Sequence, residues 1–307
     1  MRSGQLPRGG GDPPAEVRRA HPAERAGPAP GPLIPRRPRG GRSAPRSPRL
    51  PSTHAALRRA AAAILAAGLR AADPGRLVHA ALRLHGRRLL AGGASYALGP
   101  GRLVLVAAGK ASVAMAQAAE DVLGARLTDA LAVSNAPGAE LGRTRLLLSG
   151  HPLPDARGLA AAAAVEALLH GLRPVDTVLV LLSGGASALL PAPAPGLSLE
   201  DKVAVTAQLL RAGADISELN TVRKHLSRLK GGGLARTAFP ARVVALVLSD
   251  VVGDDLSTIA SGPTVADPTT YADALRVLDE RGLRASIPRA ARQHLEAGAR
   301  GGRPETP

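Results

Sequence analysis

Three clusters of small, polar and charged residues between residues 177 and 264 have the composition of a ligand-binding site. They are SGGASALL at 183–190, LNTVRKHLSRLKGGGLA at 219–235 and LSDVVGDDLSTIASGPT at 248–264. The first and the third directly follow apolar runs of strand type. Because α/β sheets bind ligands at the carboxyl ends of their strands, these segments are candidates for contact with a ligand.

The first cluster offers a permissive backbone together with hydroxyl groups. Gly184 and Gly185 allow the backbone to approach a ligand closely, and Ser183 and Ser187 can bind phosphate oxygens. The spacing fits neither the G-x-S-x-G of a nucleophile elbow nor the G-x-G-x-x-G of a dinucleotide site. We interpret the segment as a phosphate loop, with a plain strand-to-helix turn as the alternative.

Helical spacing divides the second cluster into an apolar and a polar stripe. The apolar residues, expected to be buried, are Leu219, Val222, Leu226 and Leu229. The polar stripe beside them consists of Asn220, Arg223, Lys224 and Ser227. We expect Lys230 and the glycines that follow it, Gly231 and Gly232 among them, to end this helix. A cationic edge beside glycines suits a carboxylate or a phosphate, although a solvated helix face with a glycine cap has the same pattern.

The third cluster places carboxylates directly after an apolar run. Asp250 and Asp254 can hold Mg²⁺ if a nucleotide supplies the remaining oxygen ligands. Asp250 can also accept the proton of a substrate hydroxyl. The alternative for these residues is a turn or a helix cap, and Asp255 is assigned to that role.

Lysine is rare in this chain, which makes each lysine informative. Of the 40 basic residues only four are lysines: Lys110, Lys202, Lys224 and Lys230. Where arginine is the usual surface cation, a lysine can mark a place that needs a compact positive charge. Lys110 begins a predicted helix, where the helix dipole favours an anion. The segment is not a P-loop, because Val104 stands where that motif needs a glycine. We interpret Lys110 as a phosphate contact, with an ordinary surface lysine as the alternative.

These residues need a fold that brings strand ends together. Strand-type apolar runs occupy residues 102–107, 129–134, 145–148, 177–182 and 242–248. Helical patterns occupy residues 54–72, 77–90, 110–123, 156–170, 272–280 and 289–299, and capping boxes at Ser198–Asp201 and Asp215–Glu218 open two more helices. This alternation predicts one α/β domain over residues 52–299, a doubly wound and mostly parallel Rossmann-like sheet with helices on both faces.

Composition excludes several classes of protein. The absence of cysteine excludes disulfides and thiolate metal sites, and 1% aromatic residues make base stacking, and specific nucleic-acid binding with it, unexpected. Residues 1–50 carry 11 Arg and 11 Pro against 3 acidic residues, so residues 1–51 are predicted to be a disordered tail. This tail either binds polyanions, directs the chain to an organelle or has no role. Residues 300–307 are expected to form a polar tail, and no apolar run is long enough to span a membrane.

The three clusters, together with AAGKAS at 107–112 and GHPLPDA at 150–156, resemble the glycerate 2-kinase family, whose members carry a C-terminal MOFRL domain. The resemblance covers about residues 54–290. It implies ATP- and Mg²⁺-dependent phosphorylation of D-glycerate to 2-phosphoglycerate in the cytoplasm, in a cleft between a Rossmann-like domain and a second domain.

The same resemblance implies roles for individual residues. Lys110 would contact the substrate or the transferred phosphoryl group, and Ser183–Ser187 would hold the nucleotide. Asp250 would be a metal ligand or a base. The polar residues of the cleft would be Asn220, Arg223, Lys224 and Lys230.

Two features of the chain depart from this family. Ala186 replaces the usual third glycine of the SGG loop, and GGRNQE-type and GTDG-type motifs of the second domain are absent. We therefore expect the N-terminal domain of a glycerate kinase with the MOFRL-type domain missing, and activity of this part alone is in question. The alternatives are a hydroxypyruvate reductase-type oxidoreductase and a non-catalytic truncated product, and homo-oligomer formation is left open.

Overall fold

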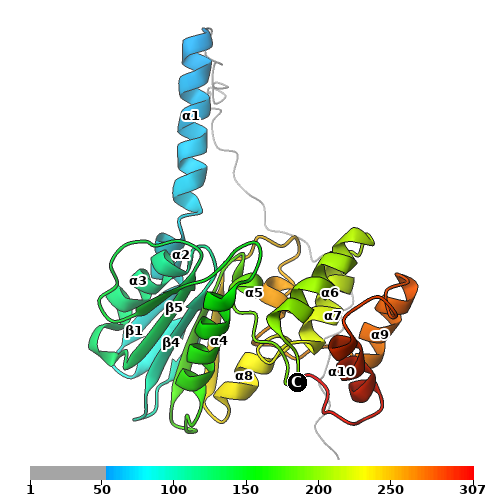
Figure 1. Cartoon of the computed structure of the whole chain (residues 1–307). Helices are drawn as coiled ribbons and strands as arrows, with labels where there is room; N and C mark the ends of the chain where they lie inside the picture. The colour runs from blue at the N-terminus through cyan, green and yellow to red at the C-terminus, as the bar shows by residue number, and fades with distance from the viewer. Residues whose placement is uncertain (1–52) are drawn as a thin grey trace, which may run out of the picture. The chain divides into compact units, whose positions relative to one another are not determined.

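A five-stranded parallel sheet lies at the centre of the computed structural model, which describes residues 53–307 (Figure 1). Its strands are β4 (Leu103–Ala108), β5 (Asp129–Ser134), β6 (Arg145–Leu148), β7 (Thr177–Leu182) and β8 (Arg242–Val247). Their spatial order is β6-β5-β4-β7-β8, so the order of connection reverses between β4 and β7. The predicted Rossmann-like fold is confirmed, and all five strands of this parallel sheet lie within one residue of their expected bounds. The tail predicted for residues 1–51 lies outside the described residues.

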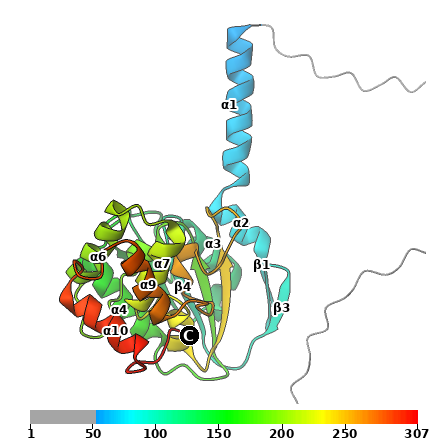
Figure 2. The same ribbon diagram turned by 90° about the vertical axis from the view of Figure 1, so that its right-hand side faces the viewer.

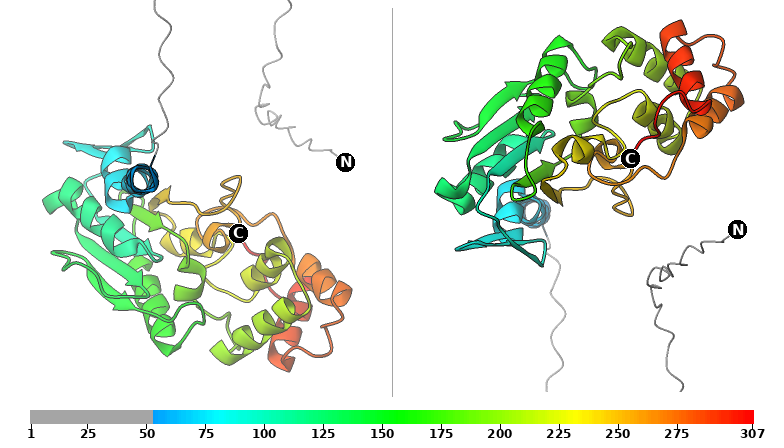
Figure 3. Two further views of the ribbon diagram at one scale, coloured as in Figure 1. Left: turned by 90° about the horizontal axis from the view of Figure 1, so that it is seen from above. Right: turned by 90° about the horizontal axis from the view of Figure 1, so that it is seen from below.

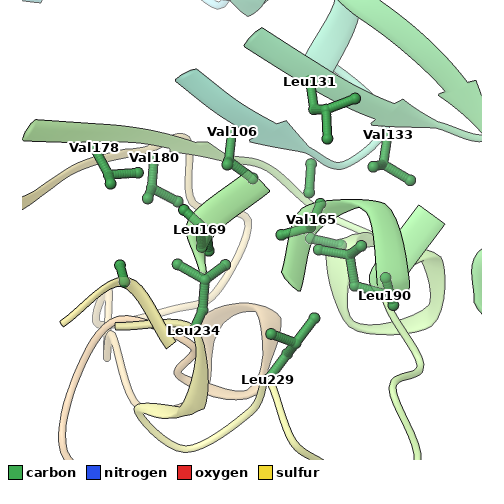
Figure 4. Close-up of a cluster of buried hydrophobic side chains, with 14 of the residues drawn as sticks. Val106, Leu131, Val133, Val165, Leu169, Val178, Val180, Leu190, Leu229 and Leu234 are labelled. Carbon is green, nitrogen blue, oxygen red and sulfur yellow. The ribbon is translucent and has the colours of Figure 1, made fainter. Parts of the chain in front are cut away.

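The central strands are apolar throughout because helices cover both faces of the sheet. Val104 and Val106 of β4 face one core, while Leu103 and Leu105 face the other. The first face packs on α4 (Ala156–Leu169), α5 (Ala186–Leu189) and α8 (Gly233–Ala238), as Figure 4 shows for part of this core. The second face packs on α2 (Pro74–Ala81) and α3 (Ser112–Leu123).

A small antiparallel sheet replaces most of the helix that was predicted over residues 77–90. Its strands are β1 (Leu82–His85), β2 (Arg88–Ala91) and β3 (Ala94–Ala97). The chain reverses at Gly86, whose φ of 57° suits a residue without a side chain. Leu82 and Leu89 are fully buried in the core on the second face of the main sheet. Burial of Leu82 and Leu89 therefore outweighs the helical pattern of the sequence.

Four helices form a separate hydrophobic cluster beside the sheet, visible from above and below in Figure 3. They are α6 (Leu199–Arg211), α7 (Ile216–His225), α9 (Tyr271–Glu280) and α10 (Arg289–Ala299). Both predicted capping boxes are present at the starts of α6 and α7. The apolar stripe predicted from Leu219 to Leu229 is buried, as expected.

The chain leaves helical geometry earlier than predicted, at His225 rather than at Lys230. The carbonyl of Leu226 accepts hydrogen bonds from the Ala194 amide at 3.0 Å and from Lys202 Nζ at 2.8 Å. These tertiary partners satisfy a carbonyl group at the end of the helix, which the local sequence does not reveal.

The last residues of the chain, predicted as a polar tail, contact the rest of the domain through hydrogen bonds. The Asp267 amide donates to the Pro307 carbonyl at 2.6 Å, and the Thr306 hydroxyl donates to the Asp267 carboxylate at 2.9 Å. Glu305 accepts a hydrogen bond from the Tyr271 amide at 3.1 Å. Residues 301–307 thus form no helix or strand, and their polar groups bond to Asp267 and to the start of α9.

The helix α1 (His54–Ala71) begins at the expected position and has no buried residue. Figures 1 and 2 show it as a rod that other elements do not cover. Within residues 53–307 no helix is long and apolar enough to cross a membrane.

Candidate functional site

Two loops meet where the strand order reverses, one after β4 and the other after β7. The Lys110 amide donates to the Gly184 carbonyl at 2.9 Å, and the Ala111 amide donates to Ser183 Oγ at 3.1 Å. Gly109 has a φ of 129°, and a Cβ atom there would lie 2.5 Å from the Ser183 carbonyl oxygen. Only glycine fits at this position, and the two loops are held together as one unit.

The loop after β7 presents two amide groups that are available to a ligand. Among residues 53–307, the amides of Gly184 and Gly185 have no hydrogen-bond acceptor. By contrast, the amides of Gly109, Lys110 and Ala111 all donate to protein groups. The Lys110 amide is therefore occupied, and Lys110 offers only its exposed side chain to an anion. The SGG loop, Ser183–Ser187, therefore has backbone donors that could bind an anion.

Three side chains with catalytic chemistry border this pair of glycines. A Cβ atom on Gly185 would lie 3.0 Å from His151 Cδ2 and 3.3 Å from Lys110 Cγ. A Cβ atom on Gly184 would lie 3.1 Å from Asp250 Cγ and closer still to Oδ2. Burial, followed by the charge of Lys110, lowers the pKa of His151 below its ordinary value of 6.5, so its imidazole is neutral at pH 7. The GHPLPDA motif contributes only to the family resemblance in the sequence, and His151 was not predicted as a site residue.

The carboxylates that were predicted to bind a metal differ in their position. Asp250 is exposed and borders Gly184 of the SGG loop, whereas Asp254 lies in the turn that follows, with a φ of 51°. No group of three or more histidine or acidic side chains with metal-binding geometry occurs among residues 53–307. One carboxylate beside bound phosphates is a donor set that suits Mg²⁺, which keeps most of its water and phosphate ligands. Asp250 therefore fits such an ion better than Asp254 does.

A cavity of about 450 Å³ adjoins the SGG loop and is lined by three cationic side chains. Gly185 and Ser187 form one side of it and His151–Pro154 another. The rest comes mainly from residues of α6 and α7 and from Lys230 in the loop that follows α7. Lys202, Arg223 and Lys230 all line this cavity, and we call them the cation triad. Lys202 and Lys230 are only 7% and 3% exposed. Arg223 and Lys230 were predicted from the sequence to be site residues, whereas Lys202 was not.

Hydrogen bonds to Ser187 fix two members of the cation triad. Lys230 Nζ donates to the Ser187 carbonyl at 2.6 Å, and the Arg223 guanidinium donates to Ser187 Oγ. Ser187 Oγ also lies 2.9 Å from Ser261 Oγ, which donates to Asn220 Oδ1 at 2.9 Å. Asn220 is buried, and its amide nitrogen donates to the Thr258 carbonyl at 3.3 Å. Asn220 therefore holds Ser261, and through it Ser187, in position at the cavity wall.

Other residues predicted to bind the ligand are engaged within the protein. Lys224 Nζ lies 3.2 Å from Asp267 Oδ1, with both side chains buried, and Lys224 does not line the cavity. The Gly231 and Gly232 amides donate to the carbonyls of Ser261 and Gly262 at 2.9 and 2.7 Å. These three residues shape the loop between α7 and α8 in this structure.

Ala186, the residue that replaces a family glycine, causes no backbone conflict. It begins α5, is buried in the core on the first face of the sheet, and is not among the residues with positive φ. The SGG loop therefore keeps its geometry without a third glycine.

Comparisons with known proteins show the family to which the chain belongs. A family model described as "Domain of unknown function (DUF4147)" matches residues 60–296. Glycerate 2-kinase from Pyrococcus horikoshii is 42% identical over 239 residues, 78% of this chain and 53% of the relative. Glycerate kinase from Homo sapiens is 46% identical over 239 residues, 72% of this chain and 46% of the relative.

The fold agrees with a solved relative as well. The crystal structure of glycerate kinase from Thermotoga maritima matches with a TM-score of 0.69 at 37% identity, over 82% of this chain and 56% of that one. The chain spans about half the length of the curated relatives that it matches.

Proposed function

We propose that this chain, which belongs to the DUF4147 family, forms the part of a glycerate 2-kinase active site that binds the transferred phosphoryl group. The reaction would transfer the γ-phosphoryl group of ATP to D-glycerate and give 2-phosphoglycerate. The observation that carries the proposal is that the amides of Gly184 and Gly185, beside Lys110, have no acceptor among residues 53–307 and lie where the strand order reverses. Backbone donors and a lysine in this position can hold phosphate oxygens.

Different groups of residues would have different roles in this reaction. The amides of the SGG loop and the Lys110 ammonium bind the phosphate groups and offset the charge that develops on the transferred phosphoryl group. The adjoining cavity receives the acceptor, since Gly185 and Ser187 belong both to the loop and to the cavity wall. Asp250, next to Gly184, would hold Mg²⁺ or accept the proton of the acceptor hydroxyl. When bound, Mg²⁺ neutralises phosphate charge.

Phosphoryl transfer can be tested with the chain itself and with a fusion to the part of the Pyrococcus horikoshii enzyme that the match leaves uncovered. We expect the fusion to form 2-phosphoglycerate from D-glycerate and ATP, measured through a coupled enolase assay. Lys110→Ala should lower the rate at least ~100-fold, the effect of losing one preorganised charge contact at a transition state. Assaying the chain alone shows whether its residues suffice.

Arg143→Ala is the matched control, because it also removes one exposed positive charge but lies away from both loops. Its rate should equal that of the unchanged protein. An unchanged rate in Lys110→Ala would remove Lys110 from the mechanism. Reduction of hydroxypyruvate by NADH without phosphoryl transfer would favour the oxidoreductase alternative instead.

A further inference from the structure

The cation triad has no acidic partner within the described part of the chain. The ion pairs of residues 53–307 engage other cations, such as Lys224 with Asp267 and Arg228 with Glu166. Lys202 Nζ has one described acceptor, the Leu226 carbonyl at 2.8 Å, and Lys230 Nζ has the Ser187 carbonyl. An ammonium group carries three N–H donors, so each lysine keeps donors for a ligand.

This arrangement is unfavourable while the cavity holds no anion. Burial, followed by the charges of Arg223 and Arg228, lowers the pKa of Lys202 well below 10.5. Burial, followed by the charges of Arg223 and Lys202, lowers the pKa of Lys230 in the same way. Buried charges in proteins are normally paired, because an unpaired charge loses its hydration without compensation. A ligand that supplies negative charge would relieve this repulsion.

We infer that Lys202, with Arg223 and Lys230, binds the carboxylate of the acceptor substrate. This inference rests on the proposed function, which places the acceptor in the cavity. Phosphate oxygens have a site of their own at the SGG loop and Lys110, whereas Lys202 reaches the cavity from α6. The remaining walls include Pro152, Leu153 and Leu219, which suit a small organic acid better than a hydrated triphosphate. A carboxylate recognised by the triad distinguishes a hydroxy acid from the uncharged polyol of the same size.

Binding to the purified chain tests this inference without any need for phosphoryl transfer. Isothermal titration should detect D-glycerate, while glycerol, which lacks the carboxylate, should not bind. Lys202→Met keeps the length of the side chain but removes its charge, and it should weaken D-glycerate binding roughly 10- to 100-fold, as expected for a lost hydrogen bond to a charged group. Arg211→Met, on the exposed end of the same helix, should leave binding unchanged.

The folding of the variant provides a second readout. Because Lys202 is a buried cation without an acidic partner, Lys202→Met should melt at the same temperature as the unchanged chain or higher when no ligand is present. D-glycerate should raise the melting temperature of the unchanged chain but not that of the variant. A folded variant that still binds D-glycerate with unchanged affinity would overturn the inference.

Titration with inorganic phosphate shows whether the cation triad binds a carboxylate or a phosphate group. If phosphate binds in a Lys202-dependent manner and D-glycerate does not, the triad belongs to the nucleotide and the carboxylate assignment is wrong. If D-glycerate binds through Lys202 but the fusion protein transfers no phosphoryl group, the proposed function fails while the carboxylate site stands. If transfer occurs and Lys202→Met leaves the KM for D-glycerate unchanged, the carboxylate site fails while the function stands.

Discussion

At the scale of single residues, Gly109 decides whether the two loops of the site can meet. Its φ is 129°, and a Cβ atom at this position would lie only 2.5 Å from the Ser183 carbonyl oxygen, which leaves no room for a side chain. Gly109→Ala should therefore lower the free energy of unfolding by about 2–5 kcal/mol, combining about 1–2 kcal/mol for the backbone with about 1–3 for overpacking. Urea denaturation measures this change.

Gly124→Ala separates the two causes. Gly124 also has a positive φ, 50°, but a Cβ atom there would meet no atom within 4 Å. Its substitution should cost only the backbone part, about 1–2 kcal/mol. If both variants lose the same stability, close packing against Ser183 is not what requires glycine at position 109.

At the same scale, the sequence predicted Ser183–Ser187 and Lys110 as site residues, and the structure brings them together, but the sequence did not predict every residue of the cavity. Ser183–Ser187 and Lys110 follow apolar runs that the sequence pattern identifies as strands. Their proximity therefore follows from the fold class. Lys202 lies on α6, away from the motif clusters, and only packing of α6 against α7 brings it to Arg223 and Lys230. The rarity of lysine in this arginine-rich chain is the signal that could have identified Lys202 as a site residue.

At the scale of elements, a strand could be predicted where a change in residue type marks both ends of an apolar run. β7 is a continuous apolar run that stops at Ser183 and Gly184, and its predicted bounds are the observed ones. β1 and β2 are four residues each, and their leucines and arginines also suit a helix. Their strand form depends on the burial of Leu82 and Leu89 in a core assembled from distant segments, which no local pattern reveals.

The helix α1 shows that a well-predicted element can contribute little to the core. Leu65 on α1 is 68% exposed, whereas Leu209 on α6 is fully buried. Leu65→Ala should change the free energy of unfolding by less than about 0.5 kcal/mol, as for other surface positions. Leu209→Ala, the same chemical change in the core of the helical cluster, should cost about 2–5 kcal/mol. A large loss in Leu65→Ala, measured by urea denaturation, would show that α1 packs against the domain.

At the scale of the whole molecule, Asp267 joins segments that are distant in the sequence. Its carboxylate pairs with Lys224 of α7, accepts from the Thr269 hydroxyl at 2.7 Å, and accepts from Thr306 near the end of the chain. A Cβ atom on Gly231 would lie 2.8 Å from the same carboxylate. Lys224, which the sequence suggested as a ligand contact, therefore holds the helical cluster to the loop that carries Lys230.

Asp267→Asn should lower the free energy of unfolding by about 3–5 kcal/mol, because it leaves the buried Lys224 charge without its partner. Asp129→Asn breaks the half-exposed pair with Arg102 and should cost less than about 1 kcal/mol. Burial acts to raise the pKa of Asp267, but hydrogen bonds from Thr269 and the charge of Lys224 lower it overall from 3.8. The stability from Asp267 is therefore present above pH 3.8 and is lost as the pH falls through the lowered pKa, so Asp267→Asn should weaken the acid dependence of unfolding in that range. Equal losses in the two variants would mean that the Asp267 pair does not hold these segments together.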